Sequence, residues 1–95
     1  MPSPAAAVAA VERSATAAFR VHARAEPGIL PRLLELFAKR GLVPALWHSA
    51  LSRDARDLVI EIEMPGLAEA VRDYMAAAMR QIVGVDVVLT AGSGG

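Results

Sequence analysis

Residues 17–41 read AAFRVHARAEPGILPRLLELFAKRG, and this stretch decides the fold. Its first eight residues alternate, with Ala17, Phe19, Val21 and Ala23 on one side and Ala18, Arg20, His22 and Arg24 on the other. This period of two predicts a half-buried strand. Pro27-Gly28 ends the strand. The apolar residues that follow have helical spacing (i, i+3, i+4, i+7) and predict a helix that ends at Gly41: Leu30, Leu33, Leu34 and Phe37.

The rest of the chain shows the same succession of strand and helix patterns separated by short loops. Residues 42–52 predict a second strand that is apolar on both parities, followed by a polar hairpin loop at 54–57. A third strand shows strict alternation, with Leu58, Ile60, Ile62 and Met64 against Val59, Glu61 and Glu63. Pro65-Gly66 opens a second helix, whose inner stripe is predicted to hold Leu67, Val71, Tyr74, Met75 and Ala78. The last strand is predicted from Val83, Val85, Val87 and Leu89.

The element order is therefore βαββαβ, which places the chain in the α+β class. Two right-handed crossovers interleave in one way, giving a ferredoxin-like fold with a four-stranded antiparallel sheet and both helices on one face. The expected strand order is second, third, first, fourth. The domain is expected to span 15–91, between a flexible Ala-rich tail at 1–14 and a flexible tail at 92–95.

Composition excludes several classes of function. There is no cysteine, so disulfide scaffolds, thiol catalysis, iron–sulfur clusters and zinc fingers are excluded. Ten basic residues balance ten acidic ones, and a net charge of zero argues against nucleic-acid binding. No apolar run approaches the ~18 residues of a membrane span, so we expect a cytoplasmic protein without a membrane partner.

The chain offers no catalytic constellation, and we expect no enzyme, no cofactor and no metal site. His22 lies on the polar side of the first strand and is predicted to face Glu61 or Glu63, as part of a charge-paired surface rather than a catalytic group. His48 adjoins Trp47 and is interpreted as an edge or interface residue, because no second metal ligand stands at a workable spacing.

Two features suggest binding. The first is the junction between the first strand and the first helix, where the first-turn N–H groups of the helix are expected to point outward and to bind an anion or an α-carboxylate. An ordinary tight turn is the alternative reading of the same residues. The candidate effector-binding residues are Ala25, Glu26, Pro27, Gly28, Ile29 and Leu30.

The second feature is the apolar edge strand at 42–52. An uncovered apolar edge promotes aggregation, so we expect a homodimer that pairs these edges, with Leu46, Trp47 and His48 at the interface. A bulge at Pro44 that twists the edge away is the alternative.

These residues resemble a known family. Residues 19–30 (FRVHARAEPGIL), residues 33–42 (LLELFAKRGL) and residues 79–85 (MRQIVGV) are similar to ACT domains. More closely, they resemble the single-domain small regulatory subunits of acetolactate (acetohydroxyacid) synthase. The resemblance covers nearly all of residues 16–91.

The resemblance implies regulation. ACT domains pair side by side and bind small effectors, often amino acids, where the first loop faces the partner chain. Gly28 matches the loop glycine of the family, and Ile29 and Leu30 follow it. Ala25 stands where the family often has Asp or Asn, which removes a contact to the amino group of an effector. The implied partners are a large catalytic synthase subunit and a small amino acid. A stand-alone amino-acid sensor is the alternative.

Overall fold

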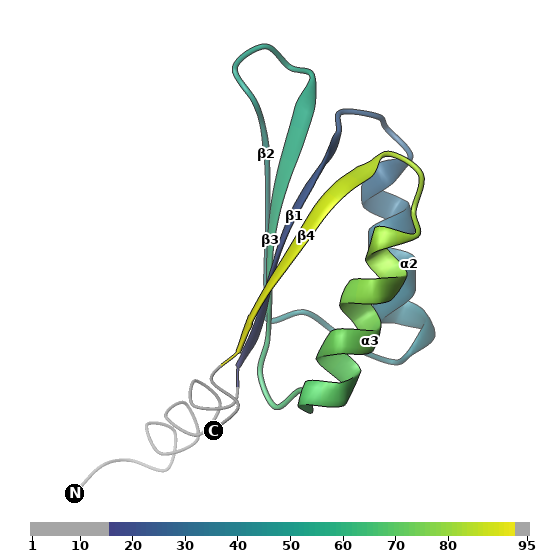
Figure 1. Cartoon of the computed structure of the whole chain (residues 1–95), viewed down its shortest axis with the longest axis vertical. Coiled ribbons are helices and arrows are strands. Elements are labelled where there is room, and N and C mark those ends of the chain that lie inside the picture. Colours follow the sequence, from purple (N-terminus) through teal and green to yellow (C-terminus); the bar gives the residue numbers. More distant parts are fainter. Residues whose placement is uncertain (1–15, 93–95) are drawn as a thin grey trace, which may run out of the picture.

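A computed structural model describes residues 16–92. Two helices and four strands follow one another along it, in the order β1 (Ala17–Arg24), α2 (Ile29–Lys39), β2 (Leu46–Leu51), β3 (Asp57–Met64), α3 (Glu69–Arg80) and β4 (Val85–Gly92). The strands form one antiparallel sheet in the order β2-β3-β1-β4, and both helices cover the same face (Figure 1). The predicted ferredoxin-like fold is confirmed. The predicted tails lie outside the described residues, except that Gly92 is the last residue of β4.

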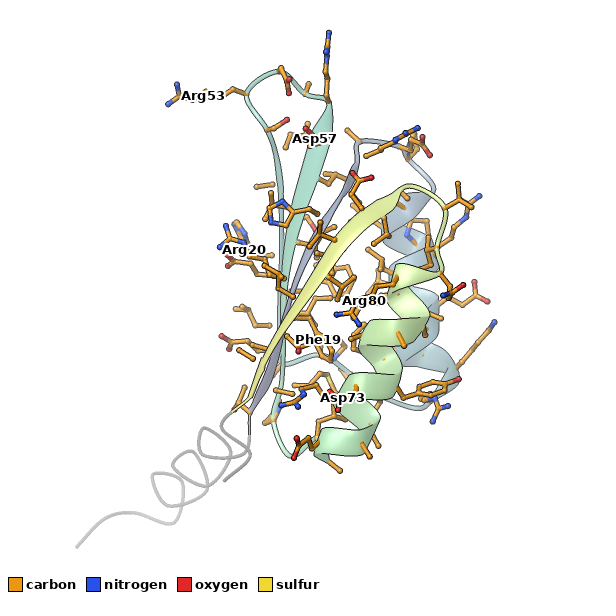
Figure 2. All side chains as sticks on the ribbon, in the orientation of Figure 1. Phe19, Arg20, Arg53, Asp57, Asp73 and Arg80 are labelled. Carbon is orange, nitrogen blue, oxygen red and sulfur yellow. The ribbon has the colours of Figure 1, made fainter. Side chains whose placement is uncertain are left out.

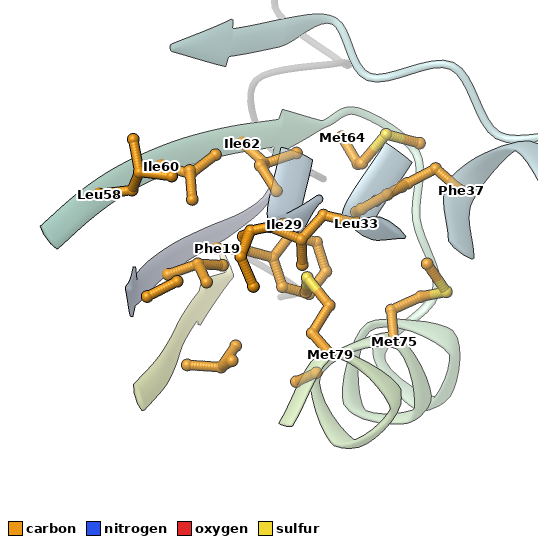
Figure 3. Packing of buried hydrophobic residues seen from close by; sticks show 14 of the residues in the cluster. Phe19, Ile29, Leu33, Phe37, Leu58, Ile60, Ile62, Met64, Met75 and Met79 are labelled. Atoms are coloured by element: carbon orange, nitrogen blue, oxygen red, sulfur yellow. The ribbon is translucent and has the colours of Figure 1, made fainter. Parts of the chain in front are cut away.

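The core lies between this sheet and the helices (Figure 3). The alternation predicted for β1 and β3 is confirmed, because the inward set on each strand is buried: Ala17, Phe19, Val21 and Ala23, then Leu58, Ile60, Ile62 and Met64. Phe19 meets Phe37 of α2 edge to face, with ring centroids 6.0 Å apart. Each large apolar side chain buried in this way contributes about 1.5–3 kcal/mol.

Both helices bury a slightly different stripe from the predicted one. On α2 the buried residues are Ile29, Leu33 and Phe37, whereas Leu34 is 45% exposed. On α3 they are Met75, Ala76 and Met79, so the inward place predicted for Tyr74 is wrong. Tyr74 is 53% exposed, and the Arg40 guanidinium lies over its ring, with Cζ 3.8 Å from the ring centroid. A period of 3.6 fixes a helical stripe only within one residue, and sheet packing chooses the phase.

The end of α2 follows the sequence closely. Gly41 has φ +68°, a left-handed conformation that side chains disfavour. Its N–H donates to the Ala38 carbonyl (3.0 Å), and the Leu42 N–H donates to the Phe37 carbonyl (2.9 Å). These two bonds make a Schellman motif, which satisfies carbonyls that the helix end would otherwise leave free.

The two edge strands differ from prediction in extent. The second strand was expected over 42–52, but β2 begins only at Leu46. Leu42 completes the helix cap, and Pro44 has no N–H to give to the sheet. β4 begins at Val85, and a register shift opposite His22 and Ala23 changes its phase. Val88 is therefore buried, whereas Val87 and Leu89 are 44% and 54% exposed on the uncovered face.

Candidate functional site

The loop between β1 and α2 is tied to both neighbouring turns. The Ala25 N–H donates to the Arg56 carbonyl in the β2–β3 hairpin (2.9 Å), and the Arg24 N–H donates to the Gly84 carbonyl before β4 (2.8 Å). Hydrogen bonds of this kind fix the loop against the sheet on two sides. The predicted effector segment is therefore a loop at one end of the domain, fixed by backbone hydrogen bonds to both neighbouring turns.

A cleft of about 410 Å³ opens between this loop and the edge strand. The loop and α2 contribute Ala25, Glu26, Pro27 and Leu30, and the strands contribute Ser49, Leu51 and Leu58. The structure thus gathers four of the six predicted effector residues against β2. Sequence reasoning missed Ser49 and Leu51, since nothing in the local pattern of β2 distinguishes the residues that meet the loop.

Two of the predicted effector-binding residues, Gly28 and Ile29, do not line the cleft. The Ile29 side chain is fully buried in the core, and its N–H donates to the Glu26 carbonyl (3.1 Å). Pro31, at the third helical position, has no N–H. The expected row of free amides at the start of α2 is therefore wrong, because among the first three helical residues this leaves Leu30 alone with a free N–H. An ordinary tight turn describes this junction better than an anion site.

Gly28 and Gly84 differ in whether the fold requires a glycine at that position. Gly28 has φ −77°, and a Cβ there would meet only the Arg32 side chain at 3.6 Å. Gly84 has φ +98°, and a Cβ there would lie 2.8 Å from Ile29 Cδ1 and 3.6 Å from Glu26 Oε2. The fold therefore requires Gly84, whereas packing within this chain leaves room for a side chain at Gly28. The Glu26 carboxylate lies on the Gly84 side of the loop.

The β2 edge carries the predicted interface residues on opposite faces. Trp47 points toward the helices and packs edge to face on Phe37, with ring centroids 6.2 Å apart. Its Nε1–H donates a hydrogen bond to Ser49 Oγ (3.0 Å). Leu46 and His48 lie on the uncovered face, where their sheet partners are Glu63 and Glu61.

The hydrogen-bond phase of β2 leaves backbone groups free at its edge. The Ser52 N–H donates to the Asp57 carbonyl (2.9 Å), so every second residue from Ser52 faces β3. Trp47, Ser49 and Leu51 therefore point their N–H and C=O groups away from the sheet. An edge strand with such groups is a template for another strand.

His22 lies on the uncovered side of β1 as predicted, but the prediction that it faces Glu61 or Glu63 is wrong. Its partner on β3 is Val59, because the inward pairs Phe19–Ile62 and Val21–Ile60 set the register and leave Glu61 opposite Arg20.

Hydrogen bonds from Ser52 Oγ (2.7 Å) and from the Arg56 N–H (3.1 Å) lower the pKa of the Asp54 carboxyl, which lies in the exposed hairpin. Within residues 16–92 no three His, Asp or Glu side chains gather as a metal ligand set. No helix in the same range is long and apolar enough to cross a membrane.

Comparison with known proteins identifies the class and then the family. The structure is similar to the ACT domain from GTP pyrophosphokinase of Chlorobium tepidum, with a TM-score of 0.67, 12% identity and coverage of 80% of this chain and 84% of that one. It is also similar to the C-terminal domain of the MgtC protein from Mycobacterium tuberculosis, with a TM-score of 0.65, 16% identity and coverage of 85% and 89%. An uncharacterized protein from Thermotoga maritima has a TM-score of 0.67 and 14% identity, with coverage of 81% and 94%.

The family model for the ACT-like domain matches residues 9–92, so the chain belongs to the ACT-like domain family. No curated protein matches the sequence. ACT domains are regulatory and non-catalytic, and they often form dimers and bind amino acids. The resemblance to ACT domains seen in the sequence is thereby confirmed, whereas the closer relationship to acetolactate synthase subunits stays a prediction.

Proposed function

We propose that this chain is a regulatory homodimer that binds a small amino acid in the cleft between the β1–α2 loop and β2. The observation that carries the proposal is the meeting of the cleft with the free edge. Ser49 and Leu51 line the cleft and also belong to the β2 residues whose backbone groups point outward. A second copy that pairs with this edge therefore also closes the side of the cleft.

Antiparallel pairing of two β2 strands across a two-fold axis at Ser49 satisfies the free groups. Trp47 of one copy then pairs with Leu51 of the other, and Ser49 pairs with itself. Six backbone groups on each copy gain partners, and the pairing joins two sheets into one. Two-fold symmetric dimers are the commonest oligomers of soluble proteins.

The lining of the cleft favours a small aliphatic amino acid. Ser49 Oγ accepts a hydrogen bond from Trp47 Nε1 and keeps its own O–H to donate to a carboxylate. Leu30, Leu51 and Leu58 offer an apolar wall for a branched side chain. Ala25 provides no polar atom for the ammonium group, so we expect weaker binding than a carboxylate or an amide there would give.

Thermal unfolding in the presence of single amino acids tests this function. Valine, leucine and isoleucine are expected to stabilise the protein, by ~2.7 kcal/mol at 100 times the Kd. Aspartate and lysine are the chemical controls. Ser49→Ala is expected to weaken the effect, and His48→Ala, on the other face of the same strand, is the matched variant that preserves it. A panel of twenty amino acids without any shift would contradict the proposal.

The regulated partner is a second question, and the sequence suggests an answer. The resemblance of residues 19–42 and 79–85 to small subunits of acetolactate synthase favours docking on a large catalytic subunit that uses thiamine diphosphate. Two of the similar structures are themselves domains of larger proteins, so the same fold occurs there as one part of a longer chain. Mixing the chain with such a catalytic subunit is expected to change its activity. No copurification and no effect at micromolar excess would contradict this partner and leave amino-acid sensing intact.

A further inference from the structure

The face of the sheet opposite the helices is uncovered and has an ordered arrangement of side chains. The register places three rows of four residues across it, in the strand order β2, β3, β1, β4. The middle row is His48, Glu61, Arg20, Leu89. The outer rows are mainly apolar: Leu46, Glu63, Ala18 and Ala91 on one side, and Ala50, Val59, His22 and Val87 on the other.

The opposite charges at the centre of this face make no ion pair among residues 16–92. Arg20 is directly opposite Glu61, and Figure 2 shows Arg20 pointing away from the helices, on the other side of the sheet from Phe19. The ion pairs formed within residues 16–92 involve Glu35, Lys39, Glu69, Arg72 and Asp73 alone. Arg20 and Glu61 are therefore available to a partner.

We propose that this face binds the same face of a second copy, with β1 of each copy lying over β3 of the other. A two-fold axis parallel to the strands, running between β1 and β3, reverses the strand order and keeps the rows aligned. It places Arg20 over Glu61 of the second copy and Glu61 over its Arg20. Arg24 and Asp57, which are also paired across β1 and β3, give a further pair of opposite charges under the same symmetry.

The outer strands fit the same arrangement. The axis places Ala50 over Val87 and Leu46 over Ala91 of the second copy, so apolar residues meet apolar residues. His48 comes to lie over Leu89 of the second copy, beside a hollow of about 240 Å³ that Leu89, Arg20 and Ala91 help to line. One operation therefore matches the central charges and the apolar residues of the outer strands, and it places Glu63 over Ala18 and His22 over Val59 of the second copy.

A perpendicular axis through the middle row has mismatched charges. It would place β1 over β1 and β3 over β3, so that Arg20 would face Arg20 and Glu61 would face Glu61. Like charges juxtaposed in an interface are unfavourable. Among two-fold axes centred on the middle row, the order of charges therefore favours the one parallel to the strands.

The size of the face matches a modest dimer. Four strands about 4.8 Å apart, three of eight residues and β2 of six, at about 3.3 Å per residue give roughly 500 Å² per copy. Two copies bury roughly 1,000 Å², which is about the lower limit for a specific interface. Partly exposed aliphatic side chains, Leu46, Val87 and Leu89, supply its apolar contacts.

This pairing is separate from the edge pairing proposed above. Its axis lies between the two stacked sheets, over the gap between β1 and β3, and the edge axis lies beside β2. The two axes do not intersect, so the two operations do not close into a point group. Use of both surfaces would give an assembly that grows with concentration. Either surface alone gives a dimer, and both together give larger assemblies. The stoichiometry of association therefore shows which surfaces are in use.

A charge exchange tests the face. Sedimentation equilibrium of the full chain at low salt should show that Arg20→Glu and Glu61→Arg each weaken face association at least tenfold, because both symmetric contacts become repulsive. The double variant R20E/E61R recreates the contacts with the signs exchanged and is expected to restore association. Arg32→Glu makes the same change of net charge as Arg20→Glu but lies on the helix side, and it is the matched control for that variant. Circular dichroism checks that each variant is folded.

A second variant separates this proposal from the edge dimer. Ser49→Pro removes an outward N–H from β2 and is expected to abolish edge pairing while leaving a face dimer that Arg20→Glu then dissociates. A monomeric Ser49→Pro protein at several hundred micromolar would overturn the face dimer and leave the edge dimer standing. The face dimer would equally be overturned if Arg20→Glu associated like the wild type, or if the double variant failed to recover.

Discussion

The two faces of the sheet are built from neighbouring residues of the same strands and differ in almost every physical respect. On the helix side, the cluster of buried residues within the described chain is wholly apolar. On the open side, aliphatic residues are mixed with Arg20, Glu61, Glu63 and two histidines. The covered face holds the fold together, and the uncovered face, with the β2 edge, keeps polar and apolar groups available for other molecules. Stability and association are therefore separable by mutation.

The largest expected effect comes from truncating the covered face. Ile60 is fully buried beneath the helices, and Ile60→Ala is expected to lower the free energy of unfolding by about 2–5 kcal/mol, because it removes buried methyl groups and leaves a cavity. Val59 is the next residue and points to the open side. Val59→Ala is expected to cost under about 1 kcal/mol. Urea unfolding measures both, and equal losses would contradict the division between the faces.

Glycine substitutions in two loops sharpen the comparison at the end of the covered face. Gly84→Ala is expected to cost about 2 kcal/mol, since φ is positive there and the new Cβ approaches Ile29, a core residue. Gly28→Ala faces only the outer surface of the loop and is expected to change stability by under about 0.5 kcal/mol. Thermal unfolding of both variants gives the comparison. A Gly28 variant that unfolds as readily as the Gly84 variant would show that the loop is constrained internally.

The β2–β3 hairpin extends past the helix layer, so neither of its faces is covered there (Figure 1). Its stability depends on backbone conformation, and Ala55 is the one non-glycine residue in the described chain with positive φ (+59°). Ala55→Gly is expected to stabilise the protein by about 1 kcal/mol, because glycine adopts this conformation without strain. Denaturant unfolding checks the sign, and a destabilised variant would mean that the Ala55 methyl group contributes contacts.

The smallest expected effect concerns pH and the same hairpin. The pKa of Asp54 is lowered from 3.8 by hydrogen bonds from Ser52 and Arg56, so its contribution to stability is present above pH 3.8 and is lost as the pH falls through the lowered pKa. Asp54→Ala is expected to lower the melting temperature slightly at pH 7. The difference from the wild type is expected to shrink by pH 2. A difference that stays constant between these pH values would contradict the assignment.

Local pattern was sufficient wherever a residue's neighbours in sequence decide its environment. The strict alternation of β1 and β3 predicted their buried sides, and Gly41 predicted the end of α2, because a left-handed cap is a local conformation. Prediction failed where packing sets a phase. Tyr74 and Leu34 both lie at the margin of a helical stripe, and the register shift beside Ala23 turned Val87 outward in a way that no local pattern of β4 reveals.

The candidate site shows the same division. The loop at residues 25–30 was found from Pro27-Gly28 alone, but its partners Ser49 and Leu51 come from a strand about twenty residues away. Ile29 follows the loop glycine and is therefore predicted in the site, but the structure buries it because α2 begins there and must cover the sheet. Gly84 lies in a segment, 79–85, that resembles the family in sequence, and its physical role is visible only through its close approach to Ile29.

The sequence by itself determined the order of elements, the fold class and the exclusion of cysteine chemistry, because composition and hydrophobic period are properties of the chain. The tertiary structure decided which residues stand opposite one another. Register is set by many inward contacts acting together, and it aligns Arg20 with Glu61 and His48, brings Leu51 to the β1–α2 loop and turns backbone groups of Trp47, Ser49 and Leu51 outward. The proposed ligand site and the proposed contact with a second copy both rest on those alignments.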